Sequence, residues 1–561
     1  MKQLIIFFSL LLVMQVSFAQ KKSIKKKSKP KITVVKKVKK IEVTDTTKKE
    51  FNVYSSFKPS LRTSAKINFS AASPAQDTSA PKLAYNVPSQ NLFFTYEPVN
   101  LKPLAYATDT TVEWVNQNFI KAGFGNFSTP YVEAGLSLGD GKQAMVMVHA
   151  THTSSKGQMD FQQFSKTSAH VIAVFSPNEN NEWITKLSID NNVYYKYGYQ
   201  PSTLVFTKDQ LKQRFTNFGV NVGVRNKVPT KFGISYYPTA QLRMFNDNNN
   251  GKEFNFILNA PISKTFGKMF AFDLAINADI TNYKAVNTIN NNLYSIAPAI
   301  KIKTPNYLLT VGLNPTWDNN TYRMLPNFST QLKIKDEKFV LLGGFVGYYN
   351  KTTYMALANT NSWLQQPLSF LNTRINETYV GLKGSGGPHF TYNAKVSSVR
   401  FYDQPLFIND FIDGKSFNVV NESDMRSLRI HGELGYSVQE KFSLLAGLTM
   451  NNYSSLKNND KAWGLPPLEL TAALRWHISK DFLIKSDLFF WDGSQYQNKA
   501  KESRKLKPAI DFNLGVEFSV LKKLNLWLQC NNLFNNTYER WNQYSVLGFN
   551  VLGGFVYSFS K

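Results

Sequence analysis

Cysteine and long apolar runs are both scarce in this chain of 561 residues. Cys530 is the only cysteine, so no intrachain disulfide can form. Outside the N-terminus we find no run of about eighteen apolar residues, which excludes an ordinary transmembrane helix there. The mean hydropathy of −0.29 resembles that of a soluble protein. Strands that alternate apolar and polar side chains are hidden from such an average, so a membrane protein built from strands stays compatible with this composition.

Motifs for catalysis and for cofactor binding are also scarce. The chain has no phosphate-binding glycine loop, no C-x-x-C pair and no zinc helix motif. Gly135-Leu-Ser-Leu-Gly139 matches the nucleophile-elbow pattern, but it lies in an alternating strand with no helix behind it. His149 and His152 are the only close histidine pair, and three residues apart on one strand they point to opposite faces. We therefore expect no enzyme, no catalytic residues, no cofactor and no metal site.

The last fifty or so residues show the clearest positive pattern. In Ala509–Val520 apolar side chains alternate with polar ones, and the alternation returns after the turn Lys522–Lys523. The chain finishes on an aromatic-rich strand, Phe549–Phe559. Because side chains on a strand have a period of two, one face meets apolar surroundings and the other meets water. Repeated along most of the chain, this pattern predicts a wall with lipid outside and water inside.

Alternating segments run from about Gln117 to the C-terminus, and we expect about twenty-two strands, two of them at 230–245 and 328–335. Short connections such as Asp140–Lys142 alternate with long polar ones such as Asn350–Arg374. Short periplasmic turns and long outer loops are typical of outer-membrane barrels, and both chain ends then lie in the periplasm. The predicted fold is all-β, a transmembrane antiparallel β-barrel of about 22 strands with an extended N-terminal lead.

Charged side chains on these strands occupy one face only. In the strand around Leu428–Val438, Arg429, His431 and Glu433 alternate with apolar residues. An arginine or lysine facing lipid at mid-bilayer costs about 2–4 kcal/mol. We therefore assign the charged faces to the lumen, and His431 and His477 are expected to be hydrated there.

The N-terminal region predicts export. A lysine, the apolar stretch Leu4–Val13 and a small-x-small site indicate a signal peptide at 1–19, cleaved between Ala19 and Gln20. A Lys-rich tether is expected at 20–49, a Pro-rich extended periplasmic lead at 50–116, and the transmembrane barrel at 117–561. Part of the formal net charge of +27 comes from the tether. After export little nucleic acid is available, so we expect no nucleic-acid partner; anionic lipid or cell wall, or a solvated tether, remain as alternatives.

The predicted outer loops are rich in asparagine and aromatic residues. Such mixtures bind sugars or peptides by stacking and by amide hydrogen bonds. They are also typical of ordinary turns and of aromatic girdles at headgroup level. The sequence leaves both interpretations open for Trp363, Trp463, Trp491, Tyr496, Tyr538 and Trp541.

The C-terminal end resembles that of TonB-dependent receptors, in which an N-N-L-F/L-N-x-x-Y segment precedes a Gly-rich aromatic closing strand. More narrowly, the lead and the opening strand Lys121–Tyr131 resemble plug-less barrels of this type. The residues that carry the C-terminal motif are Asn531, Asn532, Leu533, Phe534, Asn535, Tyr538, Gly553, Gly554 and Phe559.

The resemblance implies an outer-membrane location, outer-membrane lipid around the wall, and solute transport with a TonB-type energising complex or a periplasmic or lipoprotein partner. Energised family members hold a plug domain inside the barrel, and here only the Pro-rich segment up to Asn116 occupies that place. Two alternatives therefore stay open beside receptor-like transport. One is a passive porin, and the other is a structural or adhesive barrel whose lumen is filled by its own lead or loops.

Overall fold

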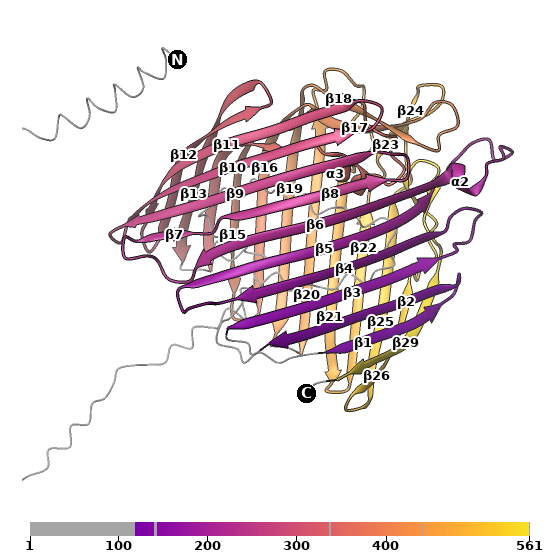
Figure 1. The fold of residues 1–561 in the computed structure, drawn as a ribbon, viewed down its shortest axis with the longest axis horizontal. Helices are drawn as coiled ribbons and strands as arrows, with labels where there is room; N and C mark the ends of the chain where they lie inside the picture. The colour runs from indigo at the N-terminus through magenta and orange to yellow at the C-terminus, as the bar shows by residue number, and fades with distance from the viewer. Residues whose placement is uncertain (1–117, 140–142, 336–337, 440, 560–561) are drawn as a thin grey trace, which may run out of the picture. The chain divides into compact units, whose positions relative to one another are not determined.

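The computed structural model describes residues 118–139, 143–335, 338–439 and 441–559, which form a closed antiparallel β-barrel (Figure 1). The predicted signal peptide with Ala19 and Gln20, the tether and the lead lie outside the described residues. No helix within the described part of the chain has the length and apolarity needed to cross a membrane.

The barrel wall contains strands from both ends of the described chain. Its first half consists of β1 (Phe119–Gly125), β2 (Thr129–Gly139), β3 (Ala144–Ser155), β4 (Phe164–Phe175), β5 (Asn181–Tyr195), β6 (Lys212–Asn226), β7 (Ile234–Tyr236), β8 (Thr239–Asp247), β9 (Lys252–Phe266), β10 (Phe270–Lys284), β11 (Thr288–Lys303) and β12 (Tyr307–Asp318). Its second half consists of β13 (Thr321–Lys335), β14 (Phe339–Asn350), β15 (Thr373–Gly386), β16 (Phe390–Tyr402), β19 (Met425–Val438), β20 (Phe442–Ser454), β21 (Leu468–Ser479), β22 (Phe482–Trp491), β25 (Ala509–Leu521), β26 (Leu524–Asn531) and β29 (Asn550–Ser558).

The sheet closes where β1 pairs with β29. At this seam Gly123 lies opposite Gly554. A Cβ atom on Gly554 would lie 1.9 Å from the carbonyl oxygen of Ala122, so the two backbones approach more closely than any side chain would permit. Glycine in a strand often marks such a close approach.

The wall has 22 strand positions, as the sequence predicts, because β7 and β8 share one position. The predicted strand 230–245 is interrupted at Tyr237–Pro238, although its register on β9 continues from the Tyr236–Ile262 pair to the Thr239–Asn259 pair. Pro238 has no N–H group for the ladder. The interruption is therefore a local loss of a donor rather than an extra turn.

One predicted strand start is wrong. The sequence predicts a strand from 328, whereas β13 begins at Thr321, immediately after a hairpin at residues 319–320. Asn319 has a positive φ of 51°, which asparagine tolerates and which tight two-residue hairpins require. The outer loop at this position is therefore much shorter than predicted.

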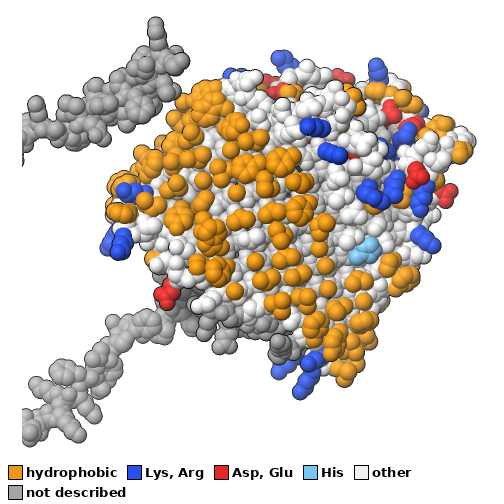
Figure 2. All heavy atoms as spheres, viewed as in Figure 1, with side chains coloured by type: hydrophobic (Ala, Val, Ile, Leu, Met, Phe, Trp, Pro, Cys, Tyr) orange, Lys and Arg blue, Asp and Glu red, His pale blue; other side chains and the backbone are white. Residues whose placement is uncertain are grey.

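The two faces of the wall differ as expected. Figure 2 shows a broad field of apolar side chains on the outside of the barrel. Leu428, Leu434 and Phe272 are exposed there, whereas Asp273, next to Phe272, is buried on the lumen side. This alternation places the apolar face against lipid and the charged face inside the barrel.

Candidate functional site

Long loops at one end of the barrel carry their own secondary structure. This is the outer end, because the loops at the other end are short turns. The loop elements are α2 (Lys208–Leu211), α3 (Tyr354–Thr360), β17 (Gln404–Asn409), β18 (Phe417–Glu422), β23 (Gln495–Gln497), β24 (Ser503–Lys505), β27 (Glu539–Trp541) and β28 (Tyr544–Ser545).

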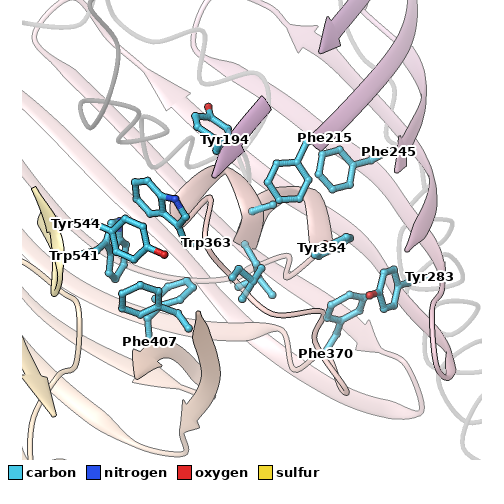
Figure 3. Packing of buried hydrophobic residues seen from close by; sticks show 14 of the residues in the cluster. Tyr194, Phe215, Phe245, Tyr283, Tyr354, Trp363, Phe370, Phe407, Trp541 and Tyr544 are labelled. Atoms are coloured by element: carbon cyan, nitrogen blue, oxygen red, sulfur yellow. The ribbon is translucent and has the colours of Figure 1, made fainter. Parts of the chain in front are cut away.

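Aromatic residues from these loops pack with lumen-facing residues of the wall into one buried group, which we call the outer-loop cluster (Figure 3). Loops that leave the wall at distant strands thus meet over the lumen. Its buried members are Phe164, Tyr194, Phe215, Phe245, Tyr283, Tyr354, Leu357, Ala358, Trp363, Leu364, Phe370, Phe407, Phe417, Trp541 and Tyr544.

Trp363 joins several parts of the cluster. Its ring stacks on Tyr544 from the loop between β26 and β29, with ring centroids 3.9 Å apart. It meets Tyr194 of β5 edge-on at 6.4 Å, and its Nε1–H donates to the Tyr195 carbonyl oxygen at 2.9 Å. Its own backbone carbonyl accepts from the Phe417 N–H. One residue therefore contacts three separate stretches of chain.

The helix α3 docks on the lumen side of strands several positions away from its own. Its first residue, Tyr354, packs edge-on against Phe215 and Phe245, which lie on β6 and β8. The Tyr354 hydroxyl donates to Asp247 Oδ2 at 2.6 Å, and the Tyr354 backbone N–H donates to Glu253 Oε2 at 2.5 Å. Burial raises the pKa of the Tyr354 hydroxyl, so it remains a donor. The loop 351–372 is thus held across the barrel mouth by both packing and hydrogen bonds.

A second fastening joins β18 to the loop between β20 and β21. The carboxylate of Glu422 accepts from the backbone N–H groups of Lys457, Asn458 and Asn459, at 2.8 to 3.1 Å. It also accepts from Asn459 Nδ2 at 3.0 Å. Burial alone would raise the pKa of Glu422, but these donors outweigh it and lower the pKa. The ionised carboxylate therefore fixes one loop to the other.

Two cations lie inside the loop layer. Burial, and then the nearby Lys415, lower the pKa of Lys196 to about 8. Burial also lowers the pKa of Arg540 to about 10. The Arg540 Nη1 group donates to the Gly464 carbonyl oxygen at 3.0 Å, and its guanidinium lies 4.6 Å from the Trp541 ring centre. The loops thus hold buried charge, which makes their packing sensitive to protonation.

Below the loops, cross-strand ion pairs occupy the lumen face of the wall. Lys395 Nζ lies 2.7 Å from Glu377 Oε1, and Lys485 Nζ lies 3.0 Å from Glu517 Oε2. Arg225 pairs with Glu182 at 2.7 Å. Such pairs confirm that the charged registers face inward, where water and opposite charges are available.

The histidines of the first wall strands contact neighbouring side chains of the wall. His149 lies 2.9 Å from Glu133 and stacks on His170 of β4, whereas His152 faces outward and bonds Thr167. No three His, Cys, Asp or Glu side chains in the described part of the chain are grouped to hold a metal ion.

The nucleophile-elbow match lies wholly within β2, from Gly135 to Gly139, with Ser137 buried. No strand-to-helix turn is present at this point. The strand interpretation made from the sequence is confirmed.

The C-terminal motif shapes the last outer loop. Asn531 ends β26, and Asn532 follows with a positive φ of 46°. The Asn532 side chain donates to the carbonyl oxygens of Asn536 and Leu547, both at 3.0 Å, and accepts the Asn536 N–H at 2.9 Å. Asn535 has a positive φ of 48°. These asparagines therefore stand where left-handed backbone is needed.

The remaining motif residues anchor that loop or close the wall. Tyr538 is buried and donates to Asp511 Oδ2 at 2.8 Å. The other members lie as follows: Leu533 donates its N–H to the Phe512 carbonyl, Phe534 stacks on Phe512, Gly553 and Gly554 lie on β29 opposite β1, and Phe559 donates its N–H to the Asn118 carbonyl.

The loop tryptophans match neither a sugar-binding surface nor a girdle, whereas the interpretation as ordinary loop residues stays open. Trp363, Trp463, Trp491 and Trp541 are each at most 3% exposed, so they neither form a girdle nor present a stacking surface for sugars. Tyr538 is also buried. They pack the loops onto one another instead. Sequence reasoning also missed Glu253 and Asp247, because their partner Tyr354 lies about a hundred residues away.

Comparison with known proteins identifies the class of fold. No family model and no curated protein matches the chain. Among solved structures it is similar to the FrpB iron transporter from Neisseria meningitidis (F3-3 variant), with a TM-score of 0.61 and 12% identity over 80% of this chain and 82% of that one. The siderophore receptor PirA from Acinetobacter baumannii gives a TM-score of 0.61 and 10% identity over 79% and 80%.

A third similar structure is the ferripyoverdine receptor of the outer membrane of Pseudomonas aeruginosa, with a TM-score of 0.59 and 10% identity over 79% of this chain and 72% of that one. The fold is therefore that of a 22-stranded TonB-receptor-like barrel, as the C-terminal residues predict. These neighbours are named as a transporter and receptors.

Proposed function

We propose that this chain moves a solute across the outer membrane and that its outer loops form the gate. The observation that carries the proposal is the outer-loop cluster, in which loops from distant strands pack around Trp363 over a charged lumen wall. A passive porin needs an open path. A polar lumen beneath a layer of packed loops fits a barrel that opens on demand.

The proposed partner acts from the periplasm. A TonB-type complex, or a periplasmic or lipoprotein partner, would engage the segment 20–116. The solved neighbours support transport as the broad function, since one is named as an iron transporter and another as a siderophore receptor. The plug-less character of the chain remains part of this proposal.

Ion conductance in planar bilayers tests the gate. We expect the mature full chain to conduct little and Trp363→Ala to conduct much more. Removing a fully buried tryptophan costs about 3–5 kcal/mol of packing, which is enough to release the loops. Trp317→Ala is the matched control, because Trp317 is 38% exposed on the outer wall. It should leave conductance unchanged.

Other results would favour the alternatives. A large conductance of the unmodified chain would indicate a porin. Silence of all forms, including a chain without residues 20–114, would indicate a structural barrel filled by its loops. Conductance that appears only without residues 20–114 would place the gate in the lead instead of the loops. Loss of solute uptake when the proton-motive force is collapsed would support an energising partner.

A further inference from the structure

A row of polar side chains crosses the outward face of the wall near its outer end. Each member pairs directly with the next one, from β3 to β11. The row consists of His152, Thr167, Asn191, Thr216, Asn246, Lys252, Lys284 and Thr288.

The neighbouring row, two residues nearer to the middle of the wall, is apolar over most of its length. It includes Ile189, Phe218, Met244 and Phe254, which are 50%, 44%, 54% and 41% exposed. Two residues span about 6.6 Å along a strand. The change from hydrocarbon-facing to polar side chains is therefore abrupt from β5 to β9, whereas on β10 and β11 the neighbouring row is already polar at Asn282 and Asn290. This boundary places the polar row at the depth of the outer-leaflet headgroups.

Within this row Lys252 and Lys284 lie directly opposite each other on β9 and β10. Like charges that face each other across strands are destabilising, so an anion bound between the two lysines would reduce their repulsion. On β6, Arg214 adds positive charge one step farther out than the row, and Lys212 adds positive charge two steps farther out. Figure 2 shows Lys and Arg side chains gathered along the margin of the apolar field toward the end where α2 lies.

These cations differ from those inside the barrel. Lumen-facing Lys395 and Lys485 each pair with a glutamate on the adjacent strand. No ion pair joins Lys252, Lys284 or Arg214 to a carboxylate in the described part of the chain. Charge that the protein itself does not neutralise, at headgroup depth, calls for an anionic partner from the membrane.

We propose that this row binds a phosphorylated glycolipid of the outer leaflet. Facing positions on adjacent strands lie about 4.5–5.5 Å apart at Cβ, so both ammonium groups can reach one phosphate. Asn246 and Thr288 flank the lysine pair in the row. Their amide and hydroxyl groups suit sugar hydroxyls. The acyl chains of the lipid then lie on Met244 and Phe254.

Lipid binding by the mature full chain tests the proposal. The probe is the bis-phosphorylated disaccharide lipid anchor of lipopolysaccharide, and bound copies are counted by native mass spectrometry. We expect the double variant Lys252→Gln/Lys284→Gln to bind about 30-fold more weakly, since each lysine near an anionic headgroup contributes about one factor of five. Lys264→Gln/Lys268→Gln removes the same charge at the periplasmic end and should bind normally.

Measurements on the unmodified chain complete the test. Removing the phosphates from the probe or raising the ionic strength should weaken binding. Equal binding by the Lys252/Lys284 variant and the control would overturn the proposal. Competition by phosphatidylglycerol as strong as that by the glycolipid, or by inorganic phosphate alone, would overturn the assignment of the glycolipid as the ligand.

Discussion

At the residue scale, Tyr354 shows how a single side chain can hold a long loop against the barrel wall. It is fully buried, its ring packs on aromatics of two wall strands, and its hydroxyl ends on the Asp247 carboxylate. Hydrogen bonds to charged groups contribute more than neutral ones, about 1.5–3 kcal/mol. The loop 351–372 is therefore held by a hydrogen bond to a charged group as well as by the packing of apolar surface.

Tyr354→Phe should loosen this loop without breaking its packing. We expect the free energy of local opening of 351–372 to fall by about 1.5–3 kcal/mol, measured by hydrogen–deuterium exchange. Tyr322→Phe is the control, because Tyr322 is 46% exposed on the wall and its ring packs at a tilt against Trp317. Equal exchange in both variants would show that the Tyr354 hydroxyl does not hold the loop.

The sequence predicts the orientation and burial of some side chains but not of others. The inward position of Asp273 and the outward position of Phe272 follow from period two alone. The burial of Trp363 does not, because its partners come from β5, β18 and β28, and no local periodicity links those segments.

At the scale of elements, the loop layer contains a group that responds to pH. Lys196 follows β5, and burial, then Lys415, lower its pKa to about 8, while Asp247, Asp413 and Asp410 partly oppose the shift. The unfolded lysine keeps its proton up to about pH 10.4. Between these values the unfolded state binds more protons, so loop packing should gain stability as pH rises from about 8 to 10.4.

Lys196→Met should abolish this dependence and stabilise the loops below pH 8. Near-UV circular dichroism of the buried tryptophans during thermal unfolding would measure it. Lys480→Met, in an exposed periplasmic turn, is the control and should retain the rise. A rise that persists in Lys196→Met would assign the pH dependence to another group.

The strands themselves were predictable as elements, whereas the loop elements were not. Each predicted wall strand corresponds to an observed position, with errors near Pro238 and at the start of β13. The helix α3 and the hairpin β17–β18 went unpredicted. They are short, and long-range packing stabilises them more than local propensity does.

At the scale of the whole molecule, the seam between β1 and β29 decides whether a barrel exists. Gly554→Val places a side chain against the Ala122 carbonyl, where even a Cβ would be only 1.9 Å away. We expect most of this variant to fail to close, measured as loss of the heat-modifiable band in gel electrophoresis.

Gly432→Ala, in the middle of β19, is the matched control. There a Cβ would meet no heavy atom nearer than 4.0 Å, so folding should be unaffected. A Gly554→Val chain that folds as well as the control would mean that the seam can move apart without cost.

The count of strands, the direction of the faces and the position of the long loops are whole-molecule properties that the sequence predicts. Alternation and connector length carry them, and both repeat along the chain. How the loops meet over the lumen could not be predicted, since it depends on contacts such as that between Glu253 and Tyr354, about a hundred residues apart.

The pairing of the first wall strand with the last has a consequence for biogenesis. β1 pairs with its sequence neighbour β2 on one side, but its other partner, β29, is the last strand of the described chain. A prematurely terminated polypeptide would keep an unpaired edge in contact with lipid, which membranes do not tolerate. A chain without β29 would thus leave both β1 and β26 without a partner on one side, and the wall would stay open.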